Sequence, residues 1–220
     1  MKLKKCLFLV AAPGSGKSTI AKRIEREFGF SHVSSGNILR AQVATGSKLG
    51  LQVERIIRDG TLVDDDLAMQ VLEASLNEMD LSSFNGLLLD GIPRTLYQVQ
   101  MFEKMYTSPD LVVNVDVPFF EIVQRLSNRL THLPSGRVYN LDFEPPKVPG
   151  IDDVTGEELV LRSDDKPEVV TQRLENYEAI TKPILDYYRE KNLVHSFRGT
   201  ETNVIWPEIQ KFLSGHFLSK

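Results

Sequence analysis

The sequence predicts an α/β protein in which a doubly wound parallel sheet is covered by helices on both faces. Short, continuous apolar runs recur along the chain, and continuous rather than alternating apolarity indicates strands that are buried on both faces. Stretches with helical spacing of apolar residues separate these runs, as expected where crossover helices join parallel strands. Two segments do not follow this alternation, and we expect both to be inserted lobes.

The strands and helices are expected to alternate in chain order. Four apolar runs predict buried strands, at residues 6–10, 86–90, 111–115 and 193–197. Residues 32–34 are a further strand candidate, although this run is short. Helical spacing is found in residues 17–28, 67–79, 121–130, 167–189 and 207–217.

The two insertions differ in character. Residues 36–64 read as two short helices that flank residues 45–47, whereas residues 131–165 contain four prolines and three glycines. The second segment is too long for an unstructured loop inside a compact domain, so we expect a small lobe that folds over the site as a mobile lid. The predicted organisation is one domain over residues 1–220, with inserted lobes at residues 34–64 and 130–165.

Composition and charge exclude several classes of protein. The chain is 41% hydrophobic and has a net charge of −4, with no block of basic residues, so nucleic acid is not an expected partner. The single Cys6 cannot form an internal disulfide, which fits a reducing compartment. The longest apolar run, residues 6–12, is far shorter than the about 20 residues of a membrane span. We therefore expect a soluble protein with no membrane partner.

The first predicted strand leads directly into a phosphate-binding motif. Residues 11–19 read AAPGSGKST, and their second half completes the form G-x-x-x-x-G-K-[ST], with Ala11 in place of the first glycine. In such loops backbone N–H groups surround phosphates, the lysine reaches the terminal oxygens and the hydroxyl binds Mg²⁺. The alternative is a glycine-rich turn without a ligand, but a strand before the motif and a helix after it favour a sheet of the P-loop nucleoside triphosphate hydrolase type.

A second chemical signal follows another predicted strand. Residues 90–94 read DGIPR, which places Asp90 at the carboxyl end of a buried strand, where α/β sheets bind ligands. Asp90 can hold Mg²⁺ through water while Arg94 reaches an anion. An Asp-Gly turn alone would not indicate a functional site. The functional interpretation is favoured because the chain also contains the phosphate loop.

Several arginines are candidates for binding phosphate groups. Arg125 and Arg129 would lie at i, i+4 on one helical face, a pairing that destabilises a helix unless an anion lies between them. Glu121 offers the alternative of an exposed ion-pair ladder. Residues 164–167, DDKP, also fit a helix N-cap with proline in the first turn. The remaining candidates, each of which could be an ordinary surface charge, are Arg40, Arg137, Arg162 and Arg173.

The predicted lid contains four polar residues with the spacing of a zinc ribbon. His132, Ser135, Asp152 and Thr155 supply one imidazole, one carboxylate and two hydroxyl groups, which is a poor ligand set for zinc. The same groups can satisfy one another, with Asp152 accepting from Ser135, Thr155 or the imidazole. We therefore expect a hydrogen-bond network and no zinc in the lid.

Taken together, these motifs resemble those of the adenylate kinases. The match covers nearly the whole chain, and several motifs in the family's order make it more specific than any one of them. After the phosphate loop, the matching motifs are SSGNILR at residues 34–40, DGIPRT at 90–95, PSGRVYN at 134–140, GIDDVTGE at 150–157 and DDKPE at 164–168. Residues 199–207, GTETNVIWP, are most similar to the mitochondrial, GTP-using branch of the family.

The resemblance implies that the chain transfers the γ-phosphoryl group of ATP or GTP to AMP. It places these residues around the transferred group: Lys17, Arg94, Arg125, Arg129, Arg162 and Arg173. It assigns the donor nucleotide to Gly14, Ser15, Gly16, Lys17, Ser18, Thr19, Arg129, Val138, Tyr139 and Glu201. It assigns AMP to Ser35, Arg40, Leu62, Val63, Gly91, Arg94, Gln98, Arg162 and Arg173.

The resemblance also implies a cofactor, a location and an oligomeric state. Mg²⁺ is expected to accompany the triphosphate, with Ser18 and, through water, Asp90 as its candidate contacts. The chain is expected to be a monomer in the mitochondrial matrix, with the cytoplasm as the alternative. The competing functions are a kinase for UMP or CMP and a nucleotide-sensing module with weak catalysis. A GTPase is disfavoured because no Asn-Lys-x-Asp motif occurs.

Three positions depart from the family pattern. Ser18 replaces the usual glycine after the lysine and restores the wider phosphate-loop form, and Ile92 replaces the usual phenylalanine. Ala11 replaces a glycine, which would weaken donor binding if the backbone there needed a positive φ.

Overall fold

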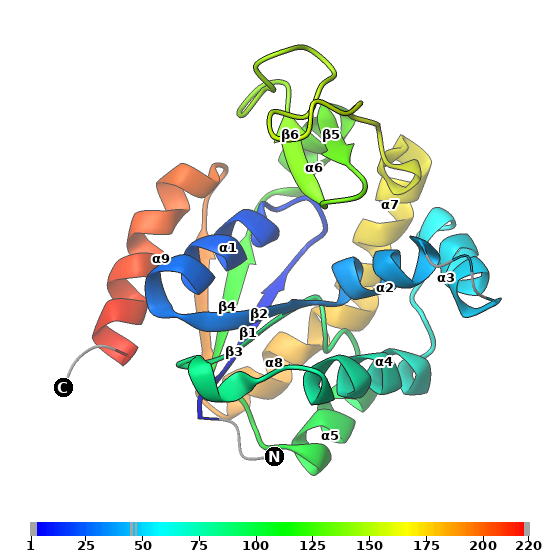
Figure 1. The fold of residues 1–220 in the computed structure, drawn as a ribbon. Coiled ribbons are helices and arrows are strands. Elements are labelled where there is room, and N and C mark those ends of the chain that lie inside the picture. The colour runs from blue at the N-terminus through cyan, green and yellow to red at the C-terminus, as the bar shows by residue number, and fades with distance from the viewer. Residues whose placement is uncertain (1–3, 45, 47, 218–220) are drawn as a thin grey trace.

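The central sheet confirms the predicted α/β fold (Figure 1). The computed structural model describes residues 4–44, 46 and 48–217. Its five-stranded sheet has the order β2-β3-β1-β4-β7, and every pairing is parallel. The strands are β1 (Cys6–Ala11), β2 (Phe30–Ser34), β3 (Gly86–Asp90), β4 (Leu111–Asp116) and β7 (Val194–Arg198). The short candidate at residues 32–34 is thus part of a strand at one edge of the sheet.

Helices connect the strands and cover both faces of the sheet. They are α1 (Lys17–Phe28), α2 (Ser35–Ala44), α3 (Lys48–Arg58), α4 (Asp65–Asn77), α5 (Leu96–Met105), α6 (Phe119–Ser127), α7 (Pro167–Asn176), α8 (Pro183–Glu190) and α9 (Thr202–Phe217). Two 3₁₀ turns, Leu81–Ser83 and Ser163–Asp165, and a π-helical turn, Tyr177–Thr181, complete the helical elements. Within the described residues no helix is both long enough and apolar enough to cross a bilayer.

The core consists of two apolar clusters, one on each face of the sheet. Side chains of β1 alternate between them, because successive residues of a strand point to opposite faces. Leu7 and Leu9 pack in the cluster covered by α1, α6, α7 and α9. Phe8 and Val10 pack in the cluster covered by α4, α5 and α8. This two-sided burial explains why the strands are apolar without alternation.

The helix predictions need four corrections. The helix predicted at 121–130 ends at Ser127, because the chain turns at Asn128 into a strand. The stretch 167–189 is interrupted by the π-helical turn. Helix α9 begins at Thr202 rather than at residue 207, since Ile205 and Trp206 already belong to its buried face. Helix α5 was not predicted, because its buried face includes a glutamine while its first residue, a leucine, is exposed.

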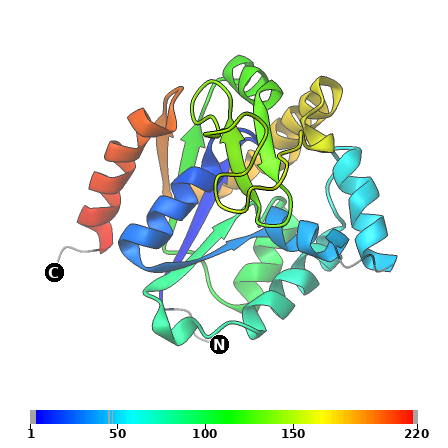
Figure 2. The same cartoon turned by 45° about the horizontal axis from the view of Figure 1, so that its top comes forward.

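The two insertions lie at the carboxyl end of the sheet. Helices α2 and α3 form most of the first, on either side of residues 45–47, of which 45 and 47 lie outside the described residues. The second contains a two-stranded antiparallel sheet, β5 (Arg129–His132) and β6 (Arg137–Asn140). Figure 2 shows this small sheet standing over the carboxyl end of β1, between α1 and α2.

Candidate active site

A cavity of about 550 Å³ opens where the carboxyl end of the sheet faces the two insertions. Its volume is typical of a site for a small molecule. Most of the residues proposed from the sequence line it: Gly14, Gly16, Lys17, Ser18, Thr19, Ser35, Arg40, Leu62, Val63, Asp90, Gly91, Arg94, Gln98, Arg125, Arg129, Val138, Tyr139, Arg162, Arg173 and Glu201. Ser15 of the same loop does not line it, because this residue is completely buried.

The loop between β1 and α1 has the geometry of an anion cradle. Gly14 and Gly16 both have φ of +83°, a left-handed conformation that favours glycine. A Cβ atom on Gly16 would lie 2.3 Å from the Thr202 hydroxyl, so the loop also needs glycine for its close approach to α9. The loop ends at the N-terminus of α1, where unpaired N–H groups and the helix dipole favour a negative charge.

Ala11 does not strain this loop. The residue is the last one of β1 and is buried. Among the described residues, Asn192 is the only non-glycine with a positive φ. The condition under which Ala11 would weaken donor binding is therefore not met.

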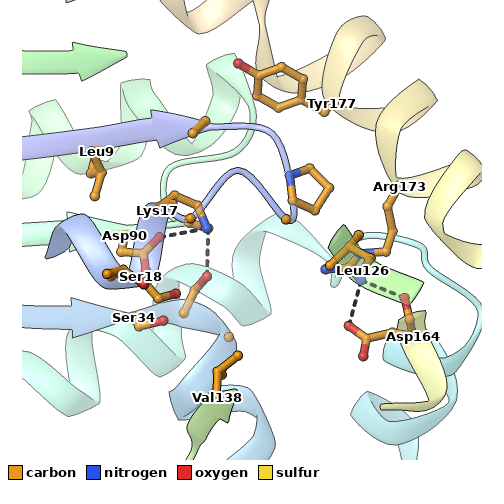
Figure 3. Close-up of a pocket in the computed structure, with 18 of the residues that line it drawn as sticks. Leu9, Lys17, Ser18, Ser34, Asp90, Leu126, Val138, Asp164, Arg173 and Tyr177 are labelled. Atoms are coloured by element: carbon orange, nitrogen blue, oxygen red, sulfur yellow. Dashed lines mark hydrogen bonds and ion pairs between the residues drawn. The ribbon is translucent and has the colours of Figure 1, made fainter. Parts of the chain in front are cut away.

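Lys17 and the buried Asp90 form an ion pair at the mouth of the loop, where the Lys17 side chain is partly exposed (Figure 3). Lys17 Nζ lies 2.9 Å from Asp90 Oδ1, and Asp90 Oδ2 lies 3.5 Å from His32 Nε2. Burial alone would raise the pKa of Asp90, but the charge of Lys17 and the contact with His32 bring it well below its usual range. Burial lowers the pKa of Lys17, and Asp90 opposes this shift. Asp90 is therefore held as a carboxylate that has spare acceptor capacity on Oδ2.

A group of arginines from four parts of the chain lines the cavity, and its members are Arg40, Arg129, Arg162 and Arg173. Arg129 donates two hydrogen bonds to Asp165, and Arg173 lies 3.0 Å from Asp164. Burial, together with the neighbouring charges of Arg129 and Arg40, lowers the pKa of Arg162 to about 9. These guanidinium groups outnumber the carboxylates of Asp164 and Asp165 that pair with them. Together they form a site that attracts a polyanion such as a phosphate group.

Two sequence interpretations of this group need correction. Arg125 and Arg129 do not share a helical face, because Arg125 lies in α6 and Arg129 begins β5. The interpretation of residues 164–167 is confirmed for Pro167, which is the first residue of α7, but not for a side-chain cap. Lys166 occupies the N-cap position of α7 without a side-chain cap, while Asp164 and Asp165 are buried against the arginines. The pairing with arginines therefore explains the position of these two carboxylates better than the dipole of α7 does.

One end of the cavity lies under the first insertion. Ser35 Oγ and Arg94 Nε both donate to the Gly91 carbonyl oxygen, each at 2.7 Å. Leu62 and Val63, from the chain between α3 and α4, add an apolar wall. The polar and apolar groups together suit the planar base and ribose of a nucleotide.

The opposite end of the cavity includes residues that were not predicted from the sequence, Arg23, Phe143 and Asn203. Arg23 of α1 donates to the Asn203 side chain of α9 at 2.5 Å, and the guanidinium of Arg125 lies 5.2 Å from the Phe143 ring centroid. Together with Val138 these side chains surround an open, partly apolar space. They come from separate elements with no shared motif, so only the fold brings them together.

The polar residues of the second insertion form the expected network, with different partners. His132 Nδ1 lies 2.7 Å from Ser135 Oγ, and Thr155 Oγ1 donates to Asp152 at 2.9 Å. Asp152, however, bonds neither Ser135 nor the imidazole, and its main partner is Arg137, which donates two hydrogen bonds of 2.8 and 2.7 Å. Arg137 therefore has a structural partner and does not line the cavity.

Two other groups complete this network. The imidazole Nε2 lies 2.5 Å from Glu157 Oε2, and Tyr139 donates its hydroxyl proton to Asp152 at 3.0 Å. Among the described residues no group of three or more histidine, cysteine, aspartate or glutamate side chains could hold a metal ion. Hydrogen bonds join the four positions that have zinc-ribbon spacing, His132, Ser135, Asp152 and Thr155, and Arg137 and Glu157 pair with two of them.

Comparisons with known proteins agree with this geometry. A family model described as "Adenylate kinase" matches residues 9–193. A protein of Drosophila melanogaster named "GTP:AMP phosphotransferase, mitochondrial" is 42% identical to this chain over 206 residues. The alignment covers 94% of each of the two chains.

Proposed function

The chain belongs to the adenylate kinase family and transfers a phosphoryl group from a nucleoside triphosphate to AMP, and we propose that GTP serves as a donor at least as well as ATP. The observation that carries the proposal is the 42% identity, over nearly full length, to a relative whose name specifies GTP. The likeness of residues 199–207 to the GTP-using branch supports it. Initial rates with AMP and each donor test it, and a GTP rate below about 1% of the ATP rate would contradict it.

The proposed site residues divide the cavity into two nucleotide subsites. Residues of the loop and of the space near Val138 and Glu201 take the donor, and residues around Ser35, Arg94 and Gln98 take AMP. We place the arginine group between the two subsites, because its members line the same cavity as the residues of both subsites. Phosphoryl transfer in line between two phosphates requires positioning and neutralisation of charge more than a strong base. Lys17 and the arginines supply that positive charge.

The oxygen atoms near the loop fit the proposed magnesium ion. Mg²⁺ prefers oxygen ligands and keeps several waters, so it needs few protein contacts. Ser18 offers a hydroxyl at the start of α1, and Asp90 offers a buried carboxylate with spare acceptor capacity on Oδ2. When bound with the triphosphate, the ion would neutralise charge on the phosphate oxygens. The protein's part is to keep Asp90 ionised, which the Lys17 pair favours.

We further propose that residues 34–64 and 130–165 are mobile lobes that close over the two nucleotides. Closure would exclude water, which otherwise competes with AMP for the transferred group. The antiparallel β5–β6 pair and the network around Asp152 make the second segment a folded unit that could move as one body. Hydrogen exchange in the two segments, measured with and without nucleotides, tests this proposal.

The relative's name also supports a mitochondrial location for this chain. We propose the matrix as the compartment and a monomer as the functional state. Fractionation of mitochondria with protease protection would distinguish the matrix from the intermembrane space. Light scattering coupled to gel filtration would determine the oligomeric state.

A further inference from the structure

Gln98 presents a buried amide to the AMP end of the cavity. The residue lies in the first turn of α5, is 2% exposed and lines the cavity. Two protein groups bind its side chain. The backbone N–H of Arg94 donates to Gln98 Oε1 at 2.7 Å, and Gln98 Nε2 donates to Asp65 Oδ1 at 2.7 Å.

These two contacts determine which way round the amide lies. A carboxylate accepts hydrogen bonds and a backbone N–H donates them, so neither partner can accommodate a flipped amide. Turning the amide over would place Oε1 against the Asp65 carboxylate and Nε2 against the Arg94 N–H. Both contacts would then be repulsive. The orientation therefore follows from the chemistry of the partners.

The fixed amide has one Nε2 hydrogen and one Oε1 lone pair left for a ligand. Adenine offers a matching pair on either edge, because its 6-amino group donates while N1 or N7 accepts. A 6-oxo purine offers the wrong pattern on both edges, since O6 only accepts and N1 carries a hydrogen. An amide free to rotate would accept either base along the N1 edge.

We propose that Asp65 is a positioning residue, which together with the Arg94 N–H fixes the Gln98 amide so that the acceptor subsite selects a 6-amino purine over a 6-oxo purine. The inference rests on the proposed placement of the AMP base beside Gln98. A site whose buried polar groups are arranged for one hydrogen-bonding pattern rejects a ligand that leaves those groups unpaired. Asp65 acts through Gln98 and does not itself touch the ligand.

The test compares Asp65→Asn with Asp66→Asn. An asparagine at position 65 can either accept or donate, so it removes the constraint from Asp65 with almost no change in shape, and only the Arg94 N–H still opposes a flipped amide. Asp66 is a matched control, because it also lies in the first turn of α4 but accepts instead from the Tyr97 hydroxyl. Both variants lose one favourable charge at a helix N-terminus, so a general loss of stability affects both. Asp65→Ala, which leaves Gln98 Nε2 to solvent, serves as a second variant.

The probes are AMP and inosine monophosphate, whose bases differ at C6 and N1. Calorimetry on each protein gives the two dissociation constants, and steady-state rates give kcat with saturating AMP. We expect the preference for AMP over inosine monophosphate to fall by about tenfold or more in Asp65→Asn and Asp65→Ala. We expect it to remain within about threefold of wild type in Asp66→Asn, and kcat with AMP to stay within about threefold in all variants.

An unchanged preference in both Asp65 variants would overturn the inference, and so would an equal fall in Asp66→Asn. Failure of the proposed function is a separate outcome, because wild-type protein would then show no phosphoryl transfer to AMP at all. A fall in kcat without a change in preference would also contradict the inference, since it would show a merely structural role for Asp65.

Discussion

Replacing Lys17 with alanine should lower turnover at least 100-fold while the chain remains folded. The ammonium group lies at the loop that is proposed to hold the triphosphate, where it would stabilise charge on the transferred phosphoryl group. A 100-fold loss corresponds to about 2.7 kcal/mol of transition-state stabilisation, at about 1.36 kcal/mol for each factor of ten. This value is within the range for removal of one preorganised electrostatic contact.

The same substitution should also lower stability, because it leaves Asp90 with His32 as its nearest partner, at 3.5 Å. The Asp90 side chain is 2% exposed, and removing one partner of a buried ion pair costs about 3–5 kcal/mol. We expect the lower end, about 3 kcal/mol, since water can reach Asp90 through the cavity. For a chain of this length, that loss lowers the melting temperature by about 6–12 °C.

The double variant Lys17→Ala/Asp90→Asn separates the two effects. Asparagine removes the unpaired charge, so part of the lost melting temperature should return, whereas turnover should not recover. Thermal unfolding followed by circular dichroism and a coupled steady-state assay measure the two quantities. A Lys17→Ala rate within about fivefold of wild type would refute the catalytic assignment. A double variant no more stable than Lys17→Ala would refute the argument about the buried charge.

Three further predictions concern the proposed acceptor subsite and the second insertion. Arg94→Ala should weaken AMP binding far more than donor binding, and calorimetry that gave the reverse order would place the two subsites the wrong way round. Asp152→Ala removes the acceptor of six hydrogen bonds. Hydrogen exchange in residues 130–165 should therefore accelerate, and the melting temperature should fall while the core stays folded. An unchanged melting temperature would show that the network is not structural. The purified protein should contain no stoichiometric zinc and chelators should leave its melting temperature unchanged, whereas one zinc per chain in elemental analysis would overturn this expectation.

The central sheet and the phosphate loop could be predicted because their signals are local. A strand buried on both faces has to be apolar at every position, and the bounds of α1 match the predicted stretch 17–28. The loop needs Gly16 for its conformation, and Lys17 follows it directly in sequence. Asp90 was found in the same way, since it ends an apolar run. In each case the residues that carry the signal are neighbours in the chain.

The arrangement of the arginines could not be predicted because their partners are distant in sequence. Arg129 and Asp165 are 36 residues apart, and both were first interpreted through their neighbours along the chain, one as part of a helix and the other as part of a cap. Arg137 was a candidate for phosphate binding, but Asp152, 15 residues away, holds it within the second insertion. Helical spacing and capping rules describe local structure, and tertiary ion pairs override both at these positions.

A coupled assay that crosses ATP and GTP with AMP, UMP and CMP tests the account most directly. We expect rapid formation of ADP from AMP with either triphosphate, with GTP at least comparable to ATP. We also expect UMP to be a poor acceptor, because O4 and N3–H of uracil mismatch the oriented Gln98 amide, and CMP to be poorer than AMP, because a single ring covers less of the apolar wall of Leu62 and Val63. Transfer to UMP or CMP at rates equal to or above the rate with AMP, or no transfer to any of the three, would contradict it.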